Sequence, residues 1–340
     1  MKFKTKDISH FKDYIRENKT VTIITHYNPD GDAIGSSTAL FRYFKLIMKD
    51  VCIVVPNYIP HSIEFLLENT DYIIAEADFK KAKKRLQETD LLIIADMNDN
   101  SRCGDNLEKI LNELNCKKVL IDHHVLPFGY DINFSYPEAS STCEVVWNVL
   151  YRLSGKKVFP PDISTSLYAG IMTDTGSLSF SCNDPGLYIV ISNLLKSGIK
   201  ANKINQKIFD TYSKNRLSLL GYAISRKLRV FDKQRAAFIA ISLSELEKFN
   251  YQPGDLEGVV NYCLKLEGVD FCALISERDK KIRMSFRSKD ESIDVNKFAR
   301  KYWNGGGHVM AAGGKSFMSL SEVVKCFTEQ IYNMDFIVKD

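Results

Sequence analysis

Residues 21–32 read VTIITHYNPDGD, an apolar run that passes directly into a polar turn. The run predicts a short buried strand, and apolar residues then recur at helical spacing from Asp32 to about residue 48. A strand that leads straight into a helix is the repeating unit of parallel α/β sheets. We therefore expect the chain to begin with a parallel α/β sheet.

The same alternation continues through the first half of the chain. Further strands are predicted at 51–55, 91–95 and 119–121, and helices at 106–114, 143–153 and 163–172. Ser141-Thr-Cys-Glu144 has the pattern of a capping box and would open the second of these helices.

The length of 340 residues suits two domains. Residues 185–225 become helical and more polar, and strand patterns return at 229–242, 271–276 and 281–287, before a helix at 293–303. We expect a first domain at 1–188, a helical connector at 189–227 and a smaller α+β domain at 228–340.

Composition excludes several classes of protein. The 46 basic and 42 acidic residues give a net charge of +4, too little for a long nucleic-acid footprint. The eight cysteines contain no C-x-x-C pair, which argues against a zinc knuckle or a thioredoxin-type site. Neither a signal peptide nor an apolar run of membrane-spanning length is evident, so we expect a cytoplasmic protein without a membrane partner.

Acidic residues and histidines gather where the predicted strands and one helix end. Because the carboxyl ends of parallel strands meet at one edge of a sheet, these side chains should lie together. Five bare carboxylates would repel one another, and two divalent cations would neutralise most of that charge. Asp32 alone could be only a helix cap, and His10 and His61 lack acidic company. The cluster consists of His26, Asp30, Asp32, Asp96, Asp122, His123, His124 and Asp174.

A second signal lies near the C-terminus, where Gly305-Gly-Gly-His308 precedes Val-Met-Ala-Ala. Glycine amides at 305, 306 and 307 could approach an anion, and residues 309–312 could open a helix whose N-terminus favours one. The plainer interpretation is a tight turn with small residues. Arg283, Ser285 and Arg287 alternate along a predicted strand and should share one face, either as phosphate ligands or as a solvated surface.

These motifs, in this order, resemble the DHH phosphoesterase superfamily, in the branch with a DHH-associated C-terminal domain that carries GGGH. Within it, the chain is most similar to the bacterial bifunctional oligoribonuclease/pAp phosphatase (nanoRNase) group. The motifs extend over nearly the whole chain. The resemblance implies an active site in the cleft between the two domains.

The resemblance also implies a role for each site residue. His26, Asp30 and Asp96 would hold one metal ion, and Asp32, Asp96, His123 and Asp174 the other, with manganese favoured. Asp122 would orient a ligating histidine, and His124 would hydrogen-bond the scissile phosphate. A second phosphate would be held by Arg283, Ser285, Arg287, His308 and the amides of Gly305, Gly306 and Gly307. Ser285 stands where some members have arginine, which would weaken one phosphate contact.

The implied activity is hydrolysis of oligonucleotides of two to five residues, of pApA and of 3′-phosphoadenosine 5′-phosphate (pAp). A long-strand DNA or RNA exonuclease and a cyclic-dinucleotide phosphodiesterase of the same superfamily are alternatives, although such proteins usually carry additional domains. A family inorganic pyrophosphatase would lack GGGH. A non-catalytic nucleotide-binding protein is the alternative of another class, and a homodimer would suit the family.

Overall fold

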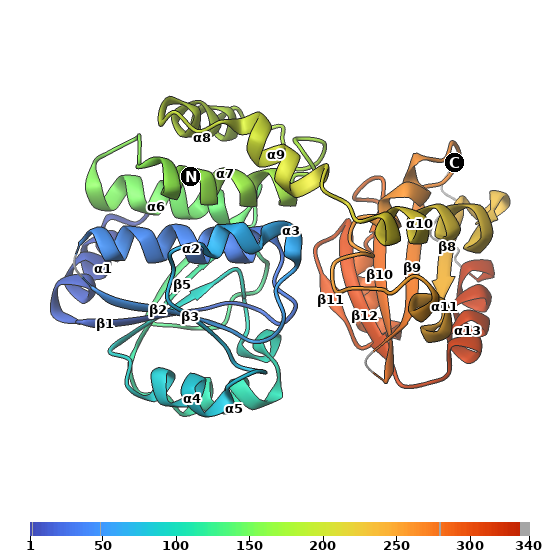
Figure 1. The fold of residues 1–340 in the computed structure, drawn as a ribbon, viewed down its shortest axis with the longest axis horizontal. Helices are drawn as coiled ribbons and strands as arrows, with labels where there is room; N and C mark the ends of the chain where they lie inside the picture. The colour runs from blue at the N-terminus through green and yellow to red at the C-terminus, as the bar shows by residue number, and fades with distance from the viewer. Residues whose placement is uncertain (2, 48, 279, 334–340) are drawn as a thin grey trace. The chain divides into compact units, whose positions relative to one another are not determined.

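The computed structural model describes residues 1, 3–47, 49–278 and 280–333. It divides into two compact units, Met1–Thr211 and Tyr212–Asp340. Each unit is built around its own six-stranded sheet (Figure 1).

The sheet of the first unit is entirely parallel, with the order β3-β2-β1-β4-β5-β6. Its strands are β1 (Thr20–Ile24), β2 (Asp50–Val55), β3 (Tyr72–Ile74), β4 (Leu91–Ala95), β5 (Lys117–Asp122) and β6 (Ile132–Ser135). The order runs outward in one direction from β1 and in the other from β4. The carboxyl ends of β1 and β4 therefore flank the switch point at which ligands bind in such sheets.

Helices cover both faces of this sheet (Figure 1). One face carries α1 (Thr5–Glu17), α2 (Gly31–Leu46), α6 (Thr142–Ser154) and α7 (Pro161–Asp174), and the other carries α4 (Phe79–Gln87) and α5 (Asp105–Glu113). Two more helices, α8 (Pro185–Lys196) and α9 (Ala201–Phe209), lie beyond α7. Short helical turns are α3 (His61–Glu64), η1 (Phe65–Leu67) and η2 (Asn100–Cys103).

Burial on both faces explains why these strands are continuous apolar runs. Neighbours in β1 serve different cores, since Ile23 belongs to the cluster beneath α2 and Ile24 to the cluster beneath α4 and α5. The close approach of α2 and α7 requires glycine, because a Cβ on Gly35 would lie 2.6 Å from the carbonyl oxygen of Ser166. This contact holds the two helices that begin or end at the acidic cluster.

The second unit has a mixed sheet of order β11-β12-β10-β9-β8-β7, in which only β8 and β9 run parallel. Its strands are β7 (Leu228–Phe231), β8 (Ala236–Ile241), β9 (Phe271–Arg278), β10 (Lys281–Ser288), β11 (Gly306–Gly307) and β12 (Ala311–Ser316). Its helical segments are α10 (Lys214–Tyr222), η3 (Ala223–Lys227), η4 (Asp232–Gln234), α11 (Leu243–Lys248), η5 (Val259–Lys265), α12 (Val295–Tyr302) and α13 (Leu320–Tyr332).

Two apolar clusters also sandwich this second sheet. One is rich in phenylalanine, and the rings of Phe271, Phe286, Phe298 and Phe327 pack against one another at centroid distances of 5.3–6.4 Å. The other joins the opposite strand faces to α10, α11 and η5 through residues such as Leu219 and Leu246.

The α/β class and the second sheet are confirmed, but several local predictions are corrected. Strands β3 and β6 were missed because they have only three and four residues. Residues 309–312 do not open a helix, since β12 begins at Ala311 and pairs with β10. The helices expected as a connector at 189–227 pack into the cores on either side, α8 and α9 in the first unit and α10 in the second.

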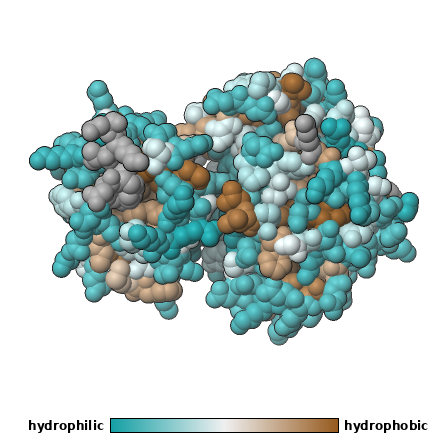
Figure 2. All heavy atoms as spheres, turned by 180° about the vertical axis from the view of Figure 1, so that it is seen from behind, coloured by the Kyte–Doolittle hydropathy of each residue, from teal (hydrophilic) through white to brown (hydrophobic). Residues whose placement is uncertain are grey.

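The visible face in Figure 2 is mostly hydrophilic, with separate hydrophobic spots. Among the described helices, none is both long and apolar enough to cross a bilayer. All eight cysteines are free thiols.

We predict that Glu245 stabilises the second unit. Its carboxylate closes the capping box of α11 with Ser242 and accepts hydrogen bonds from Tyr222 and, at 2.9 Å, from Lys227. Although burial opposes the charge, these bonds lower the pKa of Glu245 to about 2. Glu245→Ala should therefore lower the free energy of unfolding by about 1 kcal/mol at neutral pH.

Because the folded pKa is depressed, this contribution is present above the ordinary glutamate pKa and is lost as pH falls toward 2. Urea unfolding of wild type and variant at pH 7 and pH 3 measures it. Equal stabilities at pH 7 would contradict the assignment.

Candidate metal centre and phosphate site

The loop after β1 is held by hydrogen bonds at Asn28, two residues before the first aspartate of the cluster. Asn28 adopts a left-handed backbone conformation, with φ of 55°. Its amide N–H donates to Asn57 Oδ1 at 2.6 Å, and Asn57 Nδ2 donates to Asn28 Oδ1 at 2.8 Å. This paired contact ties the loop to the end of the neighbouring strand β2.

Asp30, rather than Asp32, caps helix α2. Asp30 Oδ1 accepts from the amides of Asp32 and Ala33, each at 3.0 Å. Its other oxygen, Oδ2, lies 3.9 Å from His26 Nε2. One carboxylate therefore both begins the helix and faces the acidic cluster.

Asp32 is held instead by the N-terminus of α6. Its two carboxylate oxygens accept from the amides of Thr142, at 2.6 Å, and Cys143, at 2.9 Å. Two amides at a helix N-terminus favour a negative charge. The capping pattern at 141–144 is only half realised: Ser141 accepts from the Glu144 amide, whereas the Glu144 carboxylate accepts from Ser140.

Asp96 lies at the centre of the cluster. It follows β4 with φ of 58°, a conformation that aspartate tolerates better than most residues. Its Oδ2 lies 3.3 Å from His26 Nε2, and its Oδ1 lies 3.7 Å from His123 Nε2. The hydroxyl of Thr142 donates to Oδ1 at 2.8 Å. The two oxygens of one carboxylate thus face two different histidines.

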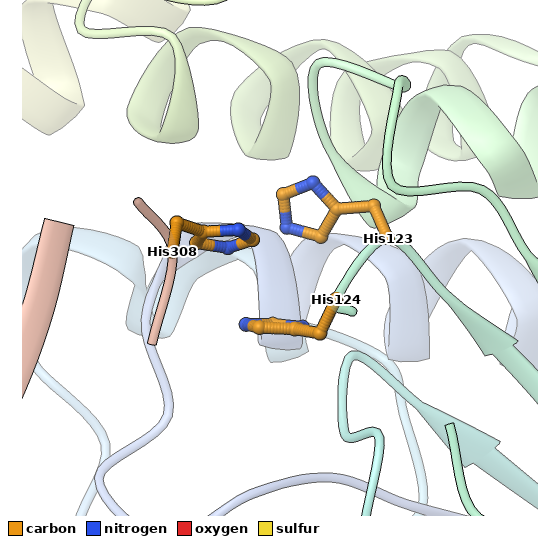
Figure 3. A group of neighbouring side chains, drawn as sticks. All are labelled: His123, His124 and His308. Carbon is orange, nitrogen blue, oxygen red and sulfur yellow. The ribbon is translucent and has the colours of Figure 1, made fainter. Parts of the chain in front are cut away.

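His123 and His124, drawn in Figure 3, follow β5 directly. Both lie 3.7 Å from Asp96 Oδ1, but their nearest partners differ. His123 Nδ1 lies 3.3 Å from the carbonyl oxygen of Ala139, and its Nε2 lies 3.4 Å from Asp174 Oδ2. His124 Nδ1 instead lies 2.7 Å from Asp122 Oδ1, and Asp122 Oδ2 accepts from the His124 amide. Asp122 therefore orients His124, the histidine expected at the phosphate, and not His123, the expected ligand.

Two groups of donor atoms that share Asp96 could each hold a metal ion. One atom each from His26, Asp30 and Asp96 lie within 4.8 Å of one another, and the same holds for Asp32, Asp96 and His123. Both histidines point Nε2 at carboxylates, while Nδ1 faces a backbone carbonyl, Tyr27 in the case of His26. That arrangement is the usual support for a metal-binding imidazole. Asp174, which is partly exposed, approaches the second group through His123.

The charges around Asp32 and His123 favour a positive charge between them. Burial and the neighbouring Asp96 and Asp174 raise the pKa of Asp32 well above its usual value. Burial opposes a charge on His123 as well, yet Asp174, Asp32 and Asp96 raise its pKa to about 9. A buried imidazole that keeps its proton among carboxylates marks a site where a cation is strongly stabilised.

Asp96 and His124 shift in the opposite direction from these neighbours. Burial disfavours the Asp96 charge, but the hydrogen bond to His26 and the nearby imidazoles outweigh it and lower the pKa. Burial, followed by the charge of Arg102, lowers the pKa of His124.

Sequence reasoning missed Thr142 and Arg102. Thr142 supplies contacts to two of the carboxylates, and Arg102, on η2, influences the pKa of both His26 and His124. The capping pattern at 141–144 located the start of α6, but no spacing rule reveals that its first amides meet an aspartate 110 residues earlier.

In the second unit, Arg283, Ser285 and Arg287 do share one face of β10. The strand alternates half-buried and buried residues along its whole length, with Ile282, Met284 and Phe286 in the core. The predicted common face is therefore present.

The glycines of the GGGH run allow a close backbone contact and an unusual backbone conformation. A Cβ on Gly305 would clash with the carbonyl oxygen of Gly313, and Gly307 has φ of 151°. Gly305 N–H donates to the Ala299 carbonyl at 3.2 Å, and Gly307 N–H donates to Asn296 Oδ1 at 3.1 Å. These two amides therefore already have partners, contrary to the expectation that they face an anion.

His308 forms the turn between β11 and β12, where its amide donates to the Ala311 carbonyl at 2.7 Å. Figure 3 also draws its side chain. The tight-turn interpretation of this run is thus correct for the backbone, and the histidine side chain remains the candidate ligand.

Two family domains match the chain. The DHH family, N-terminal domain, matches residues 20–171, and the DHHA1 domain matches residues 236–331. The first contains every candidate metal ligand except Asp174, which lies three residues beyond it, and the second contains the arginine strand and GGGH.

Relatives extend over nearly the full length. The probable bifunctional oligoribonuclease and PAP phosphatase NrnA of Streptococcus mutans is 28% identical over 91% of this chain and 93% of its own. The bifunctional oligoribonuclease and PAP phosphatase NrnA of Bacillus subtilis is 27% identical over 88% and 90%.

Among solved structures, an exopolyphosphatase-related protein from Bacteroides fragilis superposes with a TM-score of 0.91. It is 33% identical, over 97% of this chain and 96% of that one. With two matching domains, full-length relatives and a closely similar solved structure, the chain belongs to the DHH phosphoesterase family, with a DHHA1 domain as its second unit.

Proposed function

We propose that this protein is a manganese-dependent phosphoesterase that hydrolyses oligonucleotides of two to five residues, pApA and pAp. The observation that carries the proposal is Asp96, whose two oxygens face His26 and His123 in two donor groups. Relatives named as oligoribonuclease and PAP phosphatase support the substrate class. Mixed imidazole and carboxylate donors suit manganese better than calcium.

Each residue has a defined task in this proposal. His26, Asp30 and Asp96 would hold one ion, and Asp32, Asp96, His123 and Asp174 the other. Bound there, the ions would polarise the phosphate and lower the pKa of a water molecule. The helix-bound position of Asp32 and the hydroxyl contact to Asp96 keep both carboxylates oriented without movement.

His124 would contact the scissile phosphate through Nε2. Because Nδ1 donates to Asp122, the orientation of the ring is fixed, and Nε2 is the nitrogen that would contact the substrate. Nε2 can donate a hydrogen bond only when the ring is protonated, and a bound phosphate dianion would favour that proton. Asp122 is therefore a positioning residue for His124.

The second unit would recognise another phosphate of the substrate. Arg283 and Arg287 supply guanidinium groups from one strand face, and His308 supplies an imidazole from a turn. A substrate anchored by a second phosphate presents its scissile phosphate at a limited range of separations. Short substrates are then preferred over long strands.

We predict that pApA, a trinucleotide and pAp disappear faster than a 24-nucleotide RNA in the presence of manganese. Chromatography of the products measures all four, with a polyphosphate chain as a substrate that lacks nucleosides. Asp96→Asn should abolish hydrolysis, since it removes the shared charge, whereas Asp13→Asn on the surface of α1 should not.

The outcomes separate the alternatives. Equal turnover of the 24-nucleotide strand would indicate a general exonuclease, and preference for polyphosphate would overturn the nucleotide assignment. Binding of pAp with no turnover would indicate a nucleotide-binding protein without activity.

We also predict that Thr142 supports metal binding. Thr142→Val removes the hydroxyl that donates to Asp96 Oδ1 but keeps the backbone amide that donates to Asp32. Loss of such a supporting bond should weaken manganese affinity by about tenfold or more. Thr142→Ser, which keeps the hydroxyl, is the matched control.

Calorimetric titration with manganese measures the affinity, and thermal unfolding reports any loss of folding. An unchanged dissociation constant in a folded Thr142→Val protein would show that the hydroxyl has no role in the site.

A further inference from the structure

A second candidate binding site lies in the first unit, at the opposite end of α2 from the metal centre. A cavity of about 610 Å³ opens among α2, η1, α7 and α9. Lys45 lines it, and thirteen residues of helix, roughly 20 Å, separate Lys45 from Asp32. The cavity is therefore distinct from the acidic cluster.

The floor of this cavity is apolar and partly aromatic. Phe41, Leu66 and Ile204 are buried at its base, with exposed fractions of 3%, 1% and 6%, and the half-buried ring of Phe65 lines its side. Flat and apolar surfaces of this kind accommodate a nucleobase ring. The volume also falls within the usual range for small-molecule sites.

The rim is basic on the side of α9. Lys200, Lys203 and Lys207 have the helical spacing of one face, and all three line the cavity. Lys207 Nζ lies 4.6 Å from the centre of the Phe65 ring, which places a cation beside the aromatic wall. A row of lysines on a helix is commonly only a solvated surface, but this row borders a cavity with an apolar floor.

The remaining charges of the lining largely cancel. Lys45 pairs with Asp71 at 2.9 Å, and Arg42 lies 3.9 Å from Asp162 while it donates to backbone carbonyls. Glu68 is the one acidic side chain of the lining outside these pairs. The three lysines of α9 therefore give the cavity a net positive charge on one side.

The N-terminus of α9 adds to the positive potential on this side of the cavity. The helix begins at Ala201 with Lys200 as its N-cap, and no side-chain cap is present in the described chain. The amide of Lys203 donates to the Lys200 carbonyl at 2.9 Å, and the helix dipole at this end favours an anion. Lysines and helix start thus meet at the same rim.

We propose that this cavity binds a mononucleotide, with the base beside Phe65 over the apolar floor and the phosphate at Lys200, Lys203 and Lys207. The site is independent of the hydrolytic centre. It requires neither the metal ligands nor the arginine strand of the second unit.

Photoaffinity labelling with 8-azido-AMP tests the proposal in the full-length protein. After irradiation and proteolysis, mass spectrometry locates the labelled peptides, which separates this cavity from any binding elsewhere. We expect saturable labelling of peptides that contain Phe41, Phe65 or residues 200–207. AMP should compete, and adenosine and inorganic phosphate should each compete less well.

The double variant Lys200→Glu/Lys203→Glu should raise the half-saturating concentration for these peptides by about tenfold or more. The matched control is Lys80→Glu/Lys83→Glu, an equal change of charge on exposed residues of α4 that do not line the cavity.

Three results would overturn the proposal. One is labelling absent from the cavity peptides, another is an equal effect of both double variants, and the third is equal competition by adenosine and AMP. Because the readout is the position of the label and not catalysis, an inactive enzyme that still labels here would contradict the proposed hydrolysis alone.

Discussion

The arrangement of the first unit depends on holding buried carboxylates close together. Asp32, Asp96 and Asp122 are almost completely buried, and Asp30 and Asp174 lie at the edge of the same cluster. Such a group is unfavourable unless positive charge and hydrogen-bond donors compensate. The protein supplies imidazoles, helix amides and one hydroxyl as donors, and a pair of divalent cations would supply the remaining charge.

Close packing of the helices brings the compensating amides of α6 to Asp32. The N-terminus of α6 reaches Asp32 only because α2, α6 and α7 pack closely, and a side chain on Gly170 would collide with Cys143 and approach Asp32. The same closeness places the start of α2 beside the end of α7, where Asp174 lies. A stable core therefore fixes the relative positions of ligands that are far apart in the sequence.

Much of this could be predicted from the sequence, because parallel strands bring their carboxyl ends to one edge. His26, Asp96 and Asp122 each follow or end an apolar strand, so their convergence follows from the α/β class alone. Residues that act through the backbone could not be found in this way. The amides of Thr142 and Cys143 carry no signature, and β3 and β6 were too short to give a period.

The GGGH run shows a second limit of prediction from sequence. Three consecutive glycines indicate close approach of the backbone, but they do not indicate what approaches. Here the neighbour of Gly305 is the strand that carries Gly313, and the amides of Gly305 and Gly307 are used within the unit. The recognition of a second phosphate proposed for this unit would therefore depend on its side chains, above all on Arg287 and His308.

His123 and His124, the two histidines of the Asp122-His123-His124 motif, differ in their surroundings although they are adjacent in the sequence. Both rings lie 3.7 Å from Asp96 Oδ1, but the nearest carboxylate of His123 is Asp174, at 3.4 Å, and that of His124 is Asp122, at 2.7 Å. His123 has a raised pKa and His124 a lowered one. In the proposed function, a metal ion and a proton would compete for Nε2 of His123, whereas His124 would contact the phosphate of the substrate.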